Sequence, residues 1–333
     1  MKALALFSGG LDSMLAIKLI TKQGIAVHAL HFDIGFSDNE NALKILENRA
    51  NEAGATFERV NIVNKYLADV LFNPKYGYGK AFNPCIDCHG YMFKTAFAML
   101  EPYGASFVIS GEVLGQRPMS QRSDAMNQVK KLSGNDDLVL RPLCAKLLPP
   151  SLPEREGWVE RELLESISGR SRARQSELAG EFGFSEWASP GGGCPYTDQG
   201  FSARIRDFLA FEGRDRRMDE LDLRALRYGR QLRLNAGAKL IVGRDESENK
   251  KLRELFSSGL NERFELVEIA DFVGALALLS KGANDDEKAL SAKITLSYGK
   301  NQKDKIYDVK IGDFSTKACA FDDKANIKEF LVA

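Results

Sequence analysis

The chain has 333 residues, of which 44% are hydrophobic and 28% charged, a composition typical of a folded globular protein rather than a disordered or fibrous one. Its 46 basic residues balance 46 acidic ones, so overall charge gives no argument for nucleic-acid binding, and any such site must be a local patch. No run of about 18 apolar residues occurs, and the apolar stretch near the N-terminus is too short for a signal peptide. We therefore expect a cytoplasmic protein that does not contact a membrane.

Strand and helix patterns alternate through the first 110 residues. Short apolar runs predict strands, and the segments between them have helical spacing, with glycines after two of them. We expect strands at 2–7, 25–32, 56–62 and 107–110, and helices at 13–23, 39–53 and 91–100. This order is typical of an α/β fold with a doubly wound parallel sheet, in which ligands bind outside the carboxyl ends of the strands.

A proline-rich stretch at 148–153 marks a boundary. Residues 151–238 contain 14 arginines and no lysine, a pattern that indicates either phosphate contacts or a helical surface with mixed ion pairs. Beyond it we expect strands at 239–242, 264–269 and 292–298 and helices at 247–255 and 271–279. The sequence therefore predicts a doubly wound domain at 1–150, a helical arginine-rich region at 151–237 and a small α+β domain at 238–333.

The loop Ser8-Gly9-Gly10-Leu11-Asp12-Ser13 stands between the first predicted strand and the first predicted helix. Its glycines let the backbone approach a phosphate, and the helix that follows points its N–H groups and positive dipole end at the anion. The serine hydroxyls add donors, whereas the Asp12 carboxylate fits an anion site only through a cation such as Mg²⁺. No G-x-x-x-x-G-K-[ST] string occurs, so the loop is not of the Walker type. The alternative is a tight turn with two glycines and a capping serine.

This loop resembles the S-G-G-x-D-S signature of the PP-loop ATP pyrophosphatases. The resemblance implies that an acceptor attacks the α-phosphate of ATP and releases pyrophosphate, with ATP and Mg²⁺ as cofactors, and it makes residues 1–150 an ATP-binding domain. Further nucleotide contacts are expected where the second and fourth predicted strands end. The predicted nucleotide-binding residues are Ser8, Gly9, Gly10, Asp12, Ser13, His31, Asp33, Gly111, Gln116 and Arg117.

The loop after the fourth predicted strand carries a second motif, Ser110-Gly111-Glu112-Val113-Leu114-Gly115-Gln116-Arg117-Pro118-Met119-Ser120-Gln121. It resembles the G-E-x-L-G-Q-x-x-S-Q string of the tRNA 4-thiouridine synthases, and Arg141-Pro142-Leu143 also resembles a string in those enzymes. The resemblance implies that this loop lines the nucleotide pocket. A polar loop that only caps a strand is the alternative.

Three of the five cysteines lie in two motifs, Asn83-Pro84-Cys85-Ile86-Asp87-Cys88-His89 and Pro190-Gly191-Gly192-Gly193-Cys194-Pro195. The pair of motifs resembles that of the tRNA 2-thiouridylases, and three such thiols resemble thiolases that hold a [4Fe–4S] cluster. The resemblance implies Asp12, Cys85, Cys88 and Cys194 as catalytic residues, with the three cysteines as metal ligands. Structural zinc, a metal-free persulfide–disulfide relay and c-type haem attachment are the alternatives. Cys144 and Cys319 match none of these motifs.

A third string, Val242-Gly243-Arg244-Asp245-Glu246-Ser247-Glu248-Asn249, resembles one in the RNA-binding domain of the NFACT proteins. Together the resemblances imply ATP-dependent sulfur transfer to a uridine in tRNA, in which the base is adenylylated and sulfur then displaces AMP. The implied partners are tRNA and a sulfur donor such as a cysteine desulfurase or inorganic sulfide. A PP-loop amidoligase or nitrile synthase with structural zinc and a non-catalytic protein that binds nucleotide and RNA are the alternatives.

Overall fold

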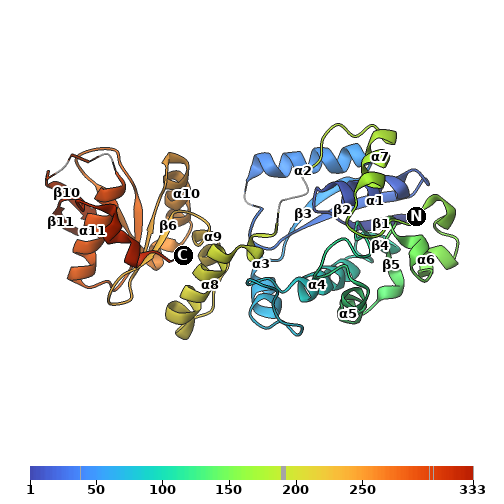
Figure 1. Ribbon diagram of the computed structural model, residues 1–333, viewed down its shortest axis with the longest axis horizontal. Helices are drawn as coiled ribbons and strands as arrows, with labels where there is room; N and C mark the ends of the chain where they lie inside the picture. The colour runs from blue at the N-terminus through green and yellow to red at the C-terminus, as the bar shows by residue number, and fades with distance from the viewer. Residues whose placement is uncertain (38, 189–192, 300, 303, 333) are drawn as a thin grey trace. The chain divides into compact units, whose positions relative to one another are not determined.

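The computed structural model describes residues 1–37, 39–188, 193–299, 301–302 and 304–332. The chain forms two compact units, Met1–Cys194 and Pro195–Ala333 (Figure 1). The first unit contains a parallel sheet and the second an antiparallel sheet. In the described ranges no helix is both long and apolar enough to span a bilayer.

The sheet of the first unit has five parallel strands in the order β3-β2-β1-β4-β5. The chain moves outward in one direction from β1 to β3 and then crosses to the other side of β1 with β4. Doubly wound sheets bind ligands where this direction changes, which here is between β1 and β4. The predicted fold class is confirmed. The strands are β1 (Lys2–Leu6), β2 (Ala26–Asp33), β3 (Thr56–Asn61), β4 (Phe107–Ser110) and β5 (Val139–Leu140).

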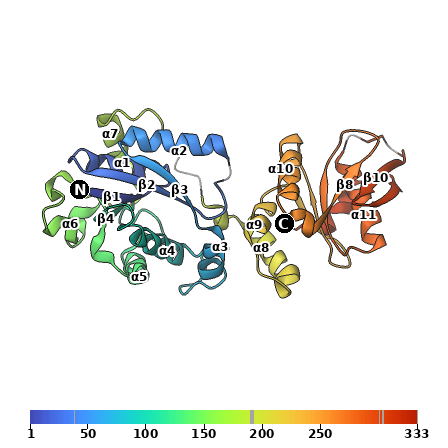
Figure 2. The same ribbon diagram turned by 180° about the vertical axis from the view of Figure 1, so that it is seen from behind.

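Helices cover both faces of this sheet. One face carries α1 (Leu11–Thr21), α2 (Glu40–Ala53) and α7 (Ala173–Glu181), and the other carries α4 (Cys85–Ala98) and α5 (Ser123–Ser133) (Figures 1 and 2). The short helical elements of this unit are α3 (Val63–Tyr66), the π-helical turn η1 (Leu67–Leu71), η2 (Asp136–Leu138), η3 (Ala145–Leu147), α6 (Leu152–Arg155) and η4 (Arg161–Leu163).

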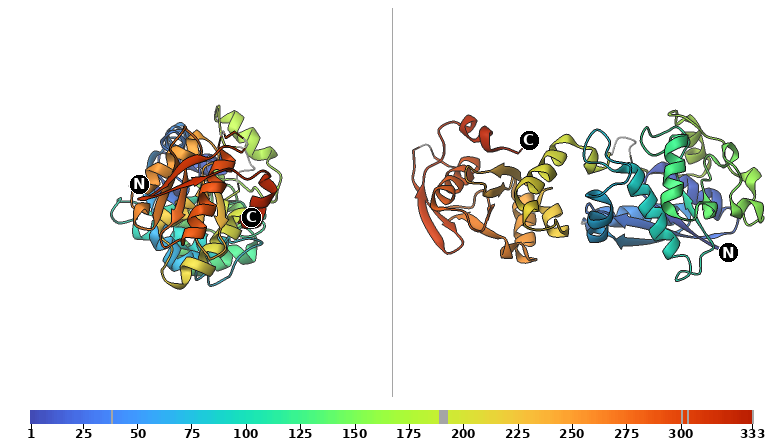
Figure 3. Two further views of the ribbon diagram at one scale, coloured as in Figure 1. Left: turned by 90° about the vertical axis from the view of Figure 1, so that its left-hand side faces the viewer. Right: turned by 90° about the horizontal axis from the view of Figure 1, so that it is seen from below.

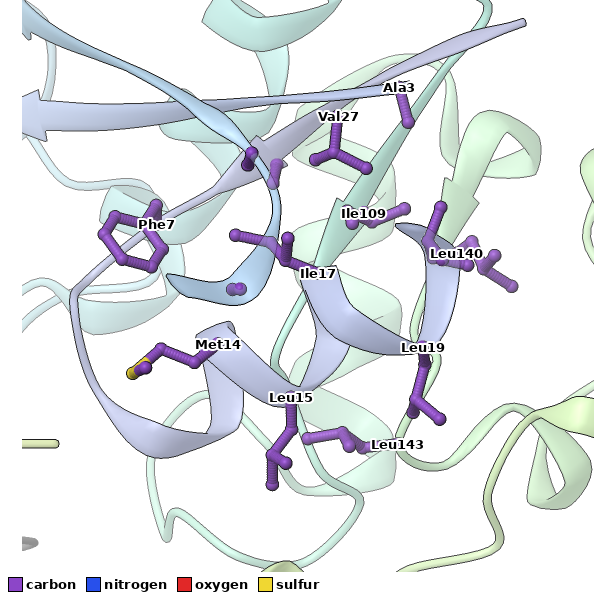
Figure 4. Packing of buried hydrophobic residues seen from close by; sticks show 14 of the residues in the cluster. Ala3, Phe7, Met14, Leu15, Ile17, Leu19, Val27, Ile109, Leu140 and Leu143 are labelled. Carbon is purple, nitrogen blue, oxygen red and sulfur yellow. The ribbon is translucent and has the colours of Figure 1, made fainter. Parts of the chain in front are cut away.

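Helix α1, which follows the phosphate loop, is buried on most sides. Met14, Leu15 and Ile17 are fully buried and pack with Phe7 and Ile109 of the neighbouring strands (Figure 4). Burial of each such side chain stabilises the fold by about 1.5–3 kcal/mol. The helix and the loop at its start are therefore held firmly against the sheet.

Residues 151–188 belong to the first unit and pass close to the loop. Ile167, Leu178 and Phe184 join the same hydrophobic core as α1. Isolated parallel bridges connect Leu114 with Ser168 and Gly10 with Ala188. This segment therefore extends the walls around the switch point.

The second unit has an antiparallel sheet in the order β11-β10-β8-β9-β7-β6. Figure 3 shows this unit, coloured from yellow to red, in two further views. Leu240 and Val242 pack in the cluster with α11, whereas Ile241 between them packs in the cluster with α10, so the two helices cover opposite faces. The elements are η5 (Pro195–Thr197), α8 (Gln199–Phe211), η6 (Glu212–Arg214), α9 (Glu220–Ala225), β6 (Arg230–Arg233), β7 (Lys239–Val242), α10 (Glu246–Ser257), η7 (Leu260–Glu262), β8 (Phe264–Ile269), β9 (Ala277–Ser280), α11 (Asp285–Tyr298), β10 (Tyr307–Ile311), β11 (Phe314–Ala318) and η8 (Lys324–Phe330).

Two predictions for the second unit were wrong. The expected helix at 271–279 is a loop followed by β9, and the expected strand at 292–298 is the last half of α11. In that half, the Thr295 and Ser297 hydroxyls donate to helix carbonyls one turn back, at 2.8 and 2.7 Å, and so remain buried at low cost. The alternation of apolar and hydroxyl side chains therefore reflects a helix buried on most sides.

Candidate nucleotide and thiol site

The phosphate loop has a tightly constrained backbone. Gly9 has a φ of +74°, and a Cβ atom there would lie 2.1 Å from the Leu46 side chain. The Ser13 hydroxyl donates to the Gly10 carbonyl at 2.8 Å and lies 3.5 Å from the Ser8 hydroxyl. The two serines therefore lie together where α1 begins and where N–H groups without helical partners are available to an anion.

The turn after β4 packs directly on this loop. A Cβ atom at Gly111 would lie 2.6 Å from backbone atoms of Asp12 and Ser13, so only glycine permits this approach. The second predicted motif thus meets the first at the switch point of the sheet.

Asp12 is the centre of a polar cluster. One carboxylate oxygen, Oδ2, accepts hydrogen bonds from Gln116 at 2.6 Å and from Arg172 at 3.4 Å, and Gln175 donates to Gln116 at 2.8 Å. The other oxygen, Oδ1, is buried and has no hydrogen-bond partner within the described residues. A buried carboxylate oxygen without a donor fits a hard cation such as Mg²⁺.

The sequence analysis missed Arg172 and Gln175. They come from the start of α7 (Ala173–Glu181), 160 and 163 positions beyond Asp12. The sequence signal was the set of arginines without lysines between 151 and 238, which indicated phosphate contacts without indicating which arginine makes them.

His31 and Asp33 lie at the end of β2, and their polar atoms have partners inside the protein. His31 Nδ1 donates to the Phe7 carbonyl at 3.0 Å, and Nε2 lies 2.8 Å from the Ser37 hydroxyl. Burial lowers the pKa of His31, so its ring is neutral at pH 7. Asp33 accepts from the backbone amides at 35–37 and from Arg59 Nε at 3.1 Å. Nucleotide binding by these two side chains stays a prediction.

Arg117 is exposed on the turn after β4, while Gln121 on the same turn is buried. The backbone N–H of Gly115 donates to the Gln121 carbonyl at 2.6 Å and closes the turn. The contact predicted between Arg117 and phosphates also stays a prediction.

We expected the first cysteine motif to lie before a helix. Instead, α4 begins within the motif. Cys85 is the first residue of α4, and the Asn83 side-chain amide donates to its sulfur at 3.1 Å. The Cys85 sulfur therefore lies at the start of the helix and accepts one side-chain hydrogen bond.

Cys88 lies one turn further along α4 and is buried. Burial raises the pKa of its thiol far above the usual value, Cys194 and Cys85 raise it further, and a hydrogen bond from the Tyr66 hydroxyl opposes them. The structure thus brings Cys85 and Cys194 within electrostatic reach of Cys88. Residues 190–192 of the second cysteine motif lie outside the described residues.

These three thiols are the metal ligands that the resemblance implies. In the described part of the chain, no group of three or more His, Cys, Asp or Glu side chains is arranged to hold a metal ion. The assignment of Cys85, Cys88 and Cys194 as metal ligands stays a prediction. Cys144 is buried beneath the turn after β4, where its thiol donates to the Glu112 carbonyl at 3.4 Å and burial raises its pKa to about 11, and Cys319 belongs to the second unit.

These surroundings predict an order of alkylation. With iodoacetamide at pH 8, we expect the exposed Cys194 to react first, the half-buried Cys85 next and Cys88 last, because a buried thiol with a raised pKa forms little thiolate. Peptide mass spectrometry over time measures the three rates, and the buried Cys144 serves as an unreactive control. Modification of Cys88 as fast as Cys194 would contradict this description of the site.

A buried ionic cluster joins the cysteine helix to the turn after β4. Glu112 accepts from His89 Nδ1 at 2.8 Å and from Arg141 Nε at 2.9 Å. Burial alone raises the pKa of Glu112, but the Arg141 charge and the His89 hydrogen bond outweigh it and hold the pKa at about 2. Since Gly111 contacts the phosphate loop and Glu112 holds His89, one turn fixes both halves of the site.

The second unit carries an arginine stacked on a tyrosine. The Arg230 guanidinium lies 4.2 Å from the centre of the Tyr298 ring and donates to the Gly243 carbonyl at 3.4 Å. Gly243 is the second residue of the string that resembles the NFACT proteins. Unpaired bases of RNA commonly stack on arginine and aromatic side chains. Other arginines of this unit are in ion pairs, such as Arg233 with Asp207 and Glu212.

The loop, its place at the switch point and the turn after β4 define a nucleotide-binding domain of the PP-loop class. In family comparisons, residues 1–146 match the model described as thiamine biosynthesis protein (ThiI), and residues 229–328 match that of the NFACT protein RNA binding domain. Residues 1–146 of the first unit are thus similar to the ThiI family, and residues 229–328 of the second are similar to the NFACT RNA-binding domain. The resemblance inferred from the motifs is confirmed.

Individual relatives align with only part of the chain. The tRNA-specific 2-thiouridylase MnmA of Petrotoga mobilis is 32% identical over 133 residues, which are 34% of this chain and 35% of that protein. A probable tRNA sulfurtransferase of Lysinibacillus sphaericus is 29% identical over 164 residues, 48% of this chain and 39% of that protein. The chain thus spans little more than a third of the curated relatives it matches.

Among solved structures, one described as a 4-thiouridine synthetase–RNA complex with bound ATP covers 59% of this chain. It is 21% identical, has a TM-score of 0.38, and is itself covered over 44% of its length.

Proposed function

We propose that this protein is an ATP-dependent tRNA sulfurtransferase that activates a uridine by adenylylation. The observation that carries the proposal is the turn at 111–112. Gly111 packs on the phosphate loop, and Glu112 holds the helix that bears Cys85 and Cys88. A nucleotide site and a thiol site built around one turn suit a reaction in which the same atom is first adenylylated and then attacked by sulfur.

In the first step, the loop at 8–13 binds the phosphates of ATP, and Gln116 orients Asp12. Asp12 Oδ1 would hold Mg²⁺, and the ion would supply positive charge to the phosphates. A carbonyl oxygen of the uridine attacks the α-phosphorus, the bond to the β-phosphate breaks, and pyrophosphate leaves. The base oxygen is then part of a phosphate ester and has become a good leaving group.

In the second step, sulfur attacks the activated carbon and AMP departs with the oxygen. With inorganic sulfide as donor, this substitution is redox-neutral. With a cysteine persulfide, the terminal sulfur bonds to carbon, a second thiolate attacks the inner sulfur, and the S–S bond breaks, leaving a disulfide between two cysteines. A thiol reductant must then restore both thiols. Cys85 and Cys194 are the proposed pair, because Cys88 is buried and its pKa is raised.

The [4Fe–4S] cluster inferred from the motifs stays a prediction of the sequence. Metal and labile-sulfide analysis of protein purified without oxygen tests it, together with a Cys194→Ala variant. About four irons and four sulfides per chain, lost in the variant, would show that the three thiols rearrange around a cluster.

The second unit is proposed to bind the tRNA. The Arg230→Ala variant is expected to bind tRNA several-fold more weakly and to reduce the slope of log affinity against log salt by about 1, because one phosphate contact is lost. Filter binding or fluorescence anisotropy at several salt concentrations measures both. Arg253→Ala, which removes an exposed arginine paired with Glu268, is the control. Equal affinities of wild type and Arg230→Ala would place the RNA surface elsewhere.

The decisive test of the function is formation of a thionucleoside. Unmodified tRNA is incubated with the protein, ATP, Mg²⁺ and sulfide, digested to nucleosides, and analysed by mass spectrometry. We expect a mass gain of about 16 Da on uridine that depends on ATP. Pyrophosphate release with tRNA present but without a sulfur-containing product would contradict the proposal.

A further inference from the structure

The phosphate loop contains no basic residue. Its sequence is Ser8-Gly9-Gly10-Leu11-Asp12-Ser13, and its one ionisable group is an acid. ATP carries about four negative charges, and one Mg²⁺ ion neutralises two of them. Further cations must therefore come from elsewhere in the fold if the loop is to bind a triphosphate.

One cation approaches from α2. Arg49 donates from one terminal nitrogen to the Gly9 carbonyl at 3.3 Å. Its Nε atom is buried and has no hydrogen-bond partner in the described ranges. Unlike Arg59 nearby, which is paired with Asp33, Arg49 is in no ion pair with a described residue.

A second cation approaches from the other side, immediately before α7. Arg172 contacts Asp12 through one nitrogen at the long distance of 3.4 Å, and this is its only side-chain hydrogen bond or ion pair with a described residue. A guanidinium has five N–H donors in a planar fork that matches phosphate oxygens, so most of this fork remains available. Two structural features hold Arg172 there: Gly169 donates to the Leu114 carbonyl at 2.8 Å, and Gln175 donates to Gln116.

We infer that Arg49 and Arg172 form a two-arginine clamp on the phosphates of the bound nucleotide, supplying the positive charge that the loop itself lacks. This inference rests on the proposed function, because it takes the loop to be an ATP site. Arg172 turns from Asp12 to the phosphates when the nucleotide enters, which leaves the Asp12 carboxylate available to a cation. Arg49 contacts the phosphates from the side of the loop on which Gly9 lies.

The test is nucleotide binding by the full chain, measured by titration calorimetry with Mg²⁺ and α,β-methylene-ATP, in which the bond to be cleaved is blocked. Arg49→Ala and Arg172→Ala are each expected to weaken binding by about 10- to 100-fold, the loss of a charge-assisted contact. Pyrophosphate binding should weaken in parallel, and adenosine binding should not change. Arg122→Ala is the matched control, because Arg122 is exposed and paired with Asp124 alone.

Lysine variants at both positions separate charge from structure. Arg49→Lys and Arg172→Lys should bind with intermediate affinity, and their unfolding temperatures should match the wild type. Unchanged analogue binding in both alanine variants would overturn the clamp but leave the proposed function intact. An equal loss of adenosine and analogue binding would also overturn it, because a damaged fold affects both ligands. No binding of the analogue by the wild type would overturn the proposed function and the clamp together.

Discussion

The Asp12→Asn variant is expected to release pyrophosphate from ATP at least about 100-fold more slowly than the wild type, since loss of the charge that holds the metal removes several kcal/mol of transition-state stabilisation. Asparagine has nearly the same shape and keeps an oxygen that can accept from Gln116, so the polar cluster around α7 remains. A coupled pyrophosphate assay in the presence of tRNA measures the rate.

The control for this variant is Asp124→Asn, in which an exposed carboxylate loses its pair with Arg122. It should release pyrophosphate at the wild-type rate. If Asp12→Asn retained full activity over a range of Mg²⁺ concentrations, the unpartnered Oδ1 atom would not be a metal ligand.

The second large effect concerns stability rather than chemistry. The free energy of unfolding of the Glu112→Ala variant is expected to be about 3–5 kcal/mol lower than that of the wild type. The reason is that the substitution leaves the buried Arg141 guanidinium without the Glu112 carboxylate. Chemical denaturation measures the change. Glu101→Ala, at an exposed position, is the control and should change little. A loss below about 1 kcal/mol for Glu112→Ala would show that the cluster does not stabilise the unit.

The same cluster predicts how stability depends on pH. The pKa of Glu112 is about 2 in the folded chain, against an ordinary value of 4.5. Its contribution is therefore complete above about pH 4.5 and is lost progressively as the pH falls towards 2, where the folded carboxylate also binds a proton. The Glu112→Ala variant should show a smaller loss of stability over this interval than the wild type.

Local patterns were sufficient to predict the nucleotide loop. A buried strand, two glycines and a helix follow one another within 20 residues, and this order fixes where the backbone amides point. Gln116 could also be placed there, because its motif follows a strand that ends beside β1. These positions depend on short-range pattern and on the rule that parallel strands present their carboxyl ends at one edge.

Arg49, Arg172 and Gln175 could not be predicted in the same way. Each contacts the loop region from a helix or turn whose packing is decided by core residues such as Leu46 and Leu178. Arg172 is one of 14 arginines in its region, and many of the others form ion pairs, such as Arg174 with three glutamates. The sequence does not distinguish a paired arginine from an unpaired one, because the difference depends on which carboxylates lie nearby.

The position of the cysteine helix was missed for a different reason. Pro84 precedes Cys85, and a proline at the start of a helix is a recognised N-terminal signal. The sequence analysis expects this helix at 91–100, after the motif. With the helix starting at Cys85, the two thiols differ in burial, which the spacing of the motif alone did not indicate.

The central claim is that a uridine of tRNA is adenylylated before sulfur reaches it. The most direct measurement is transfer of label from ATP to tRNA with the sulfur donor withheld, using ATP labelled at either the α- or the γ-phosphate. We expect label from α-labelled ATP to become covalently attached to tRNA, to be released as AMP when sulfide is added, and to be absent with γ-labelled ATP. Label attached from γ-labelled ATP, or thionucleoside formed with no AMP released, would contradict the account.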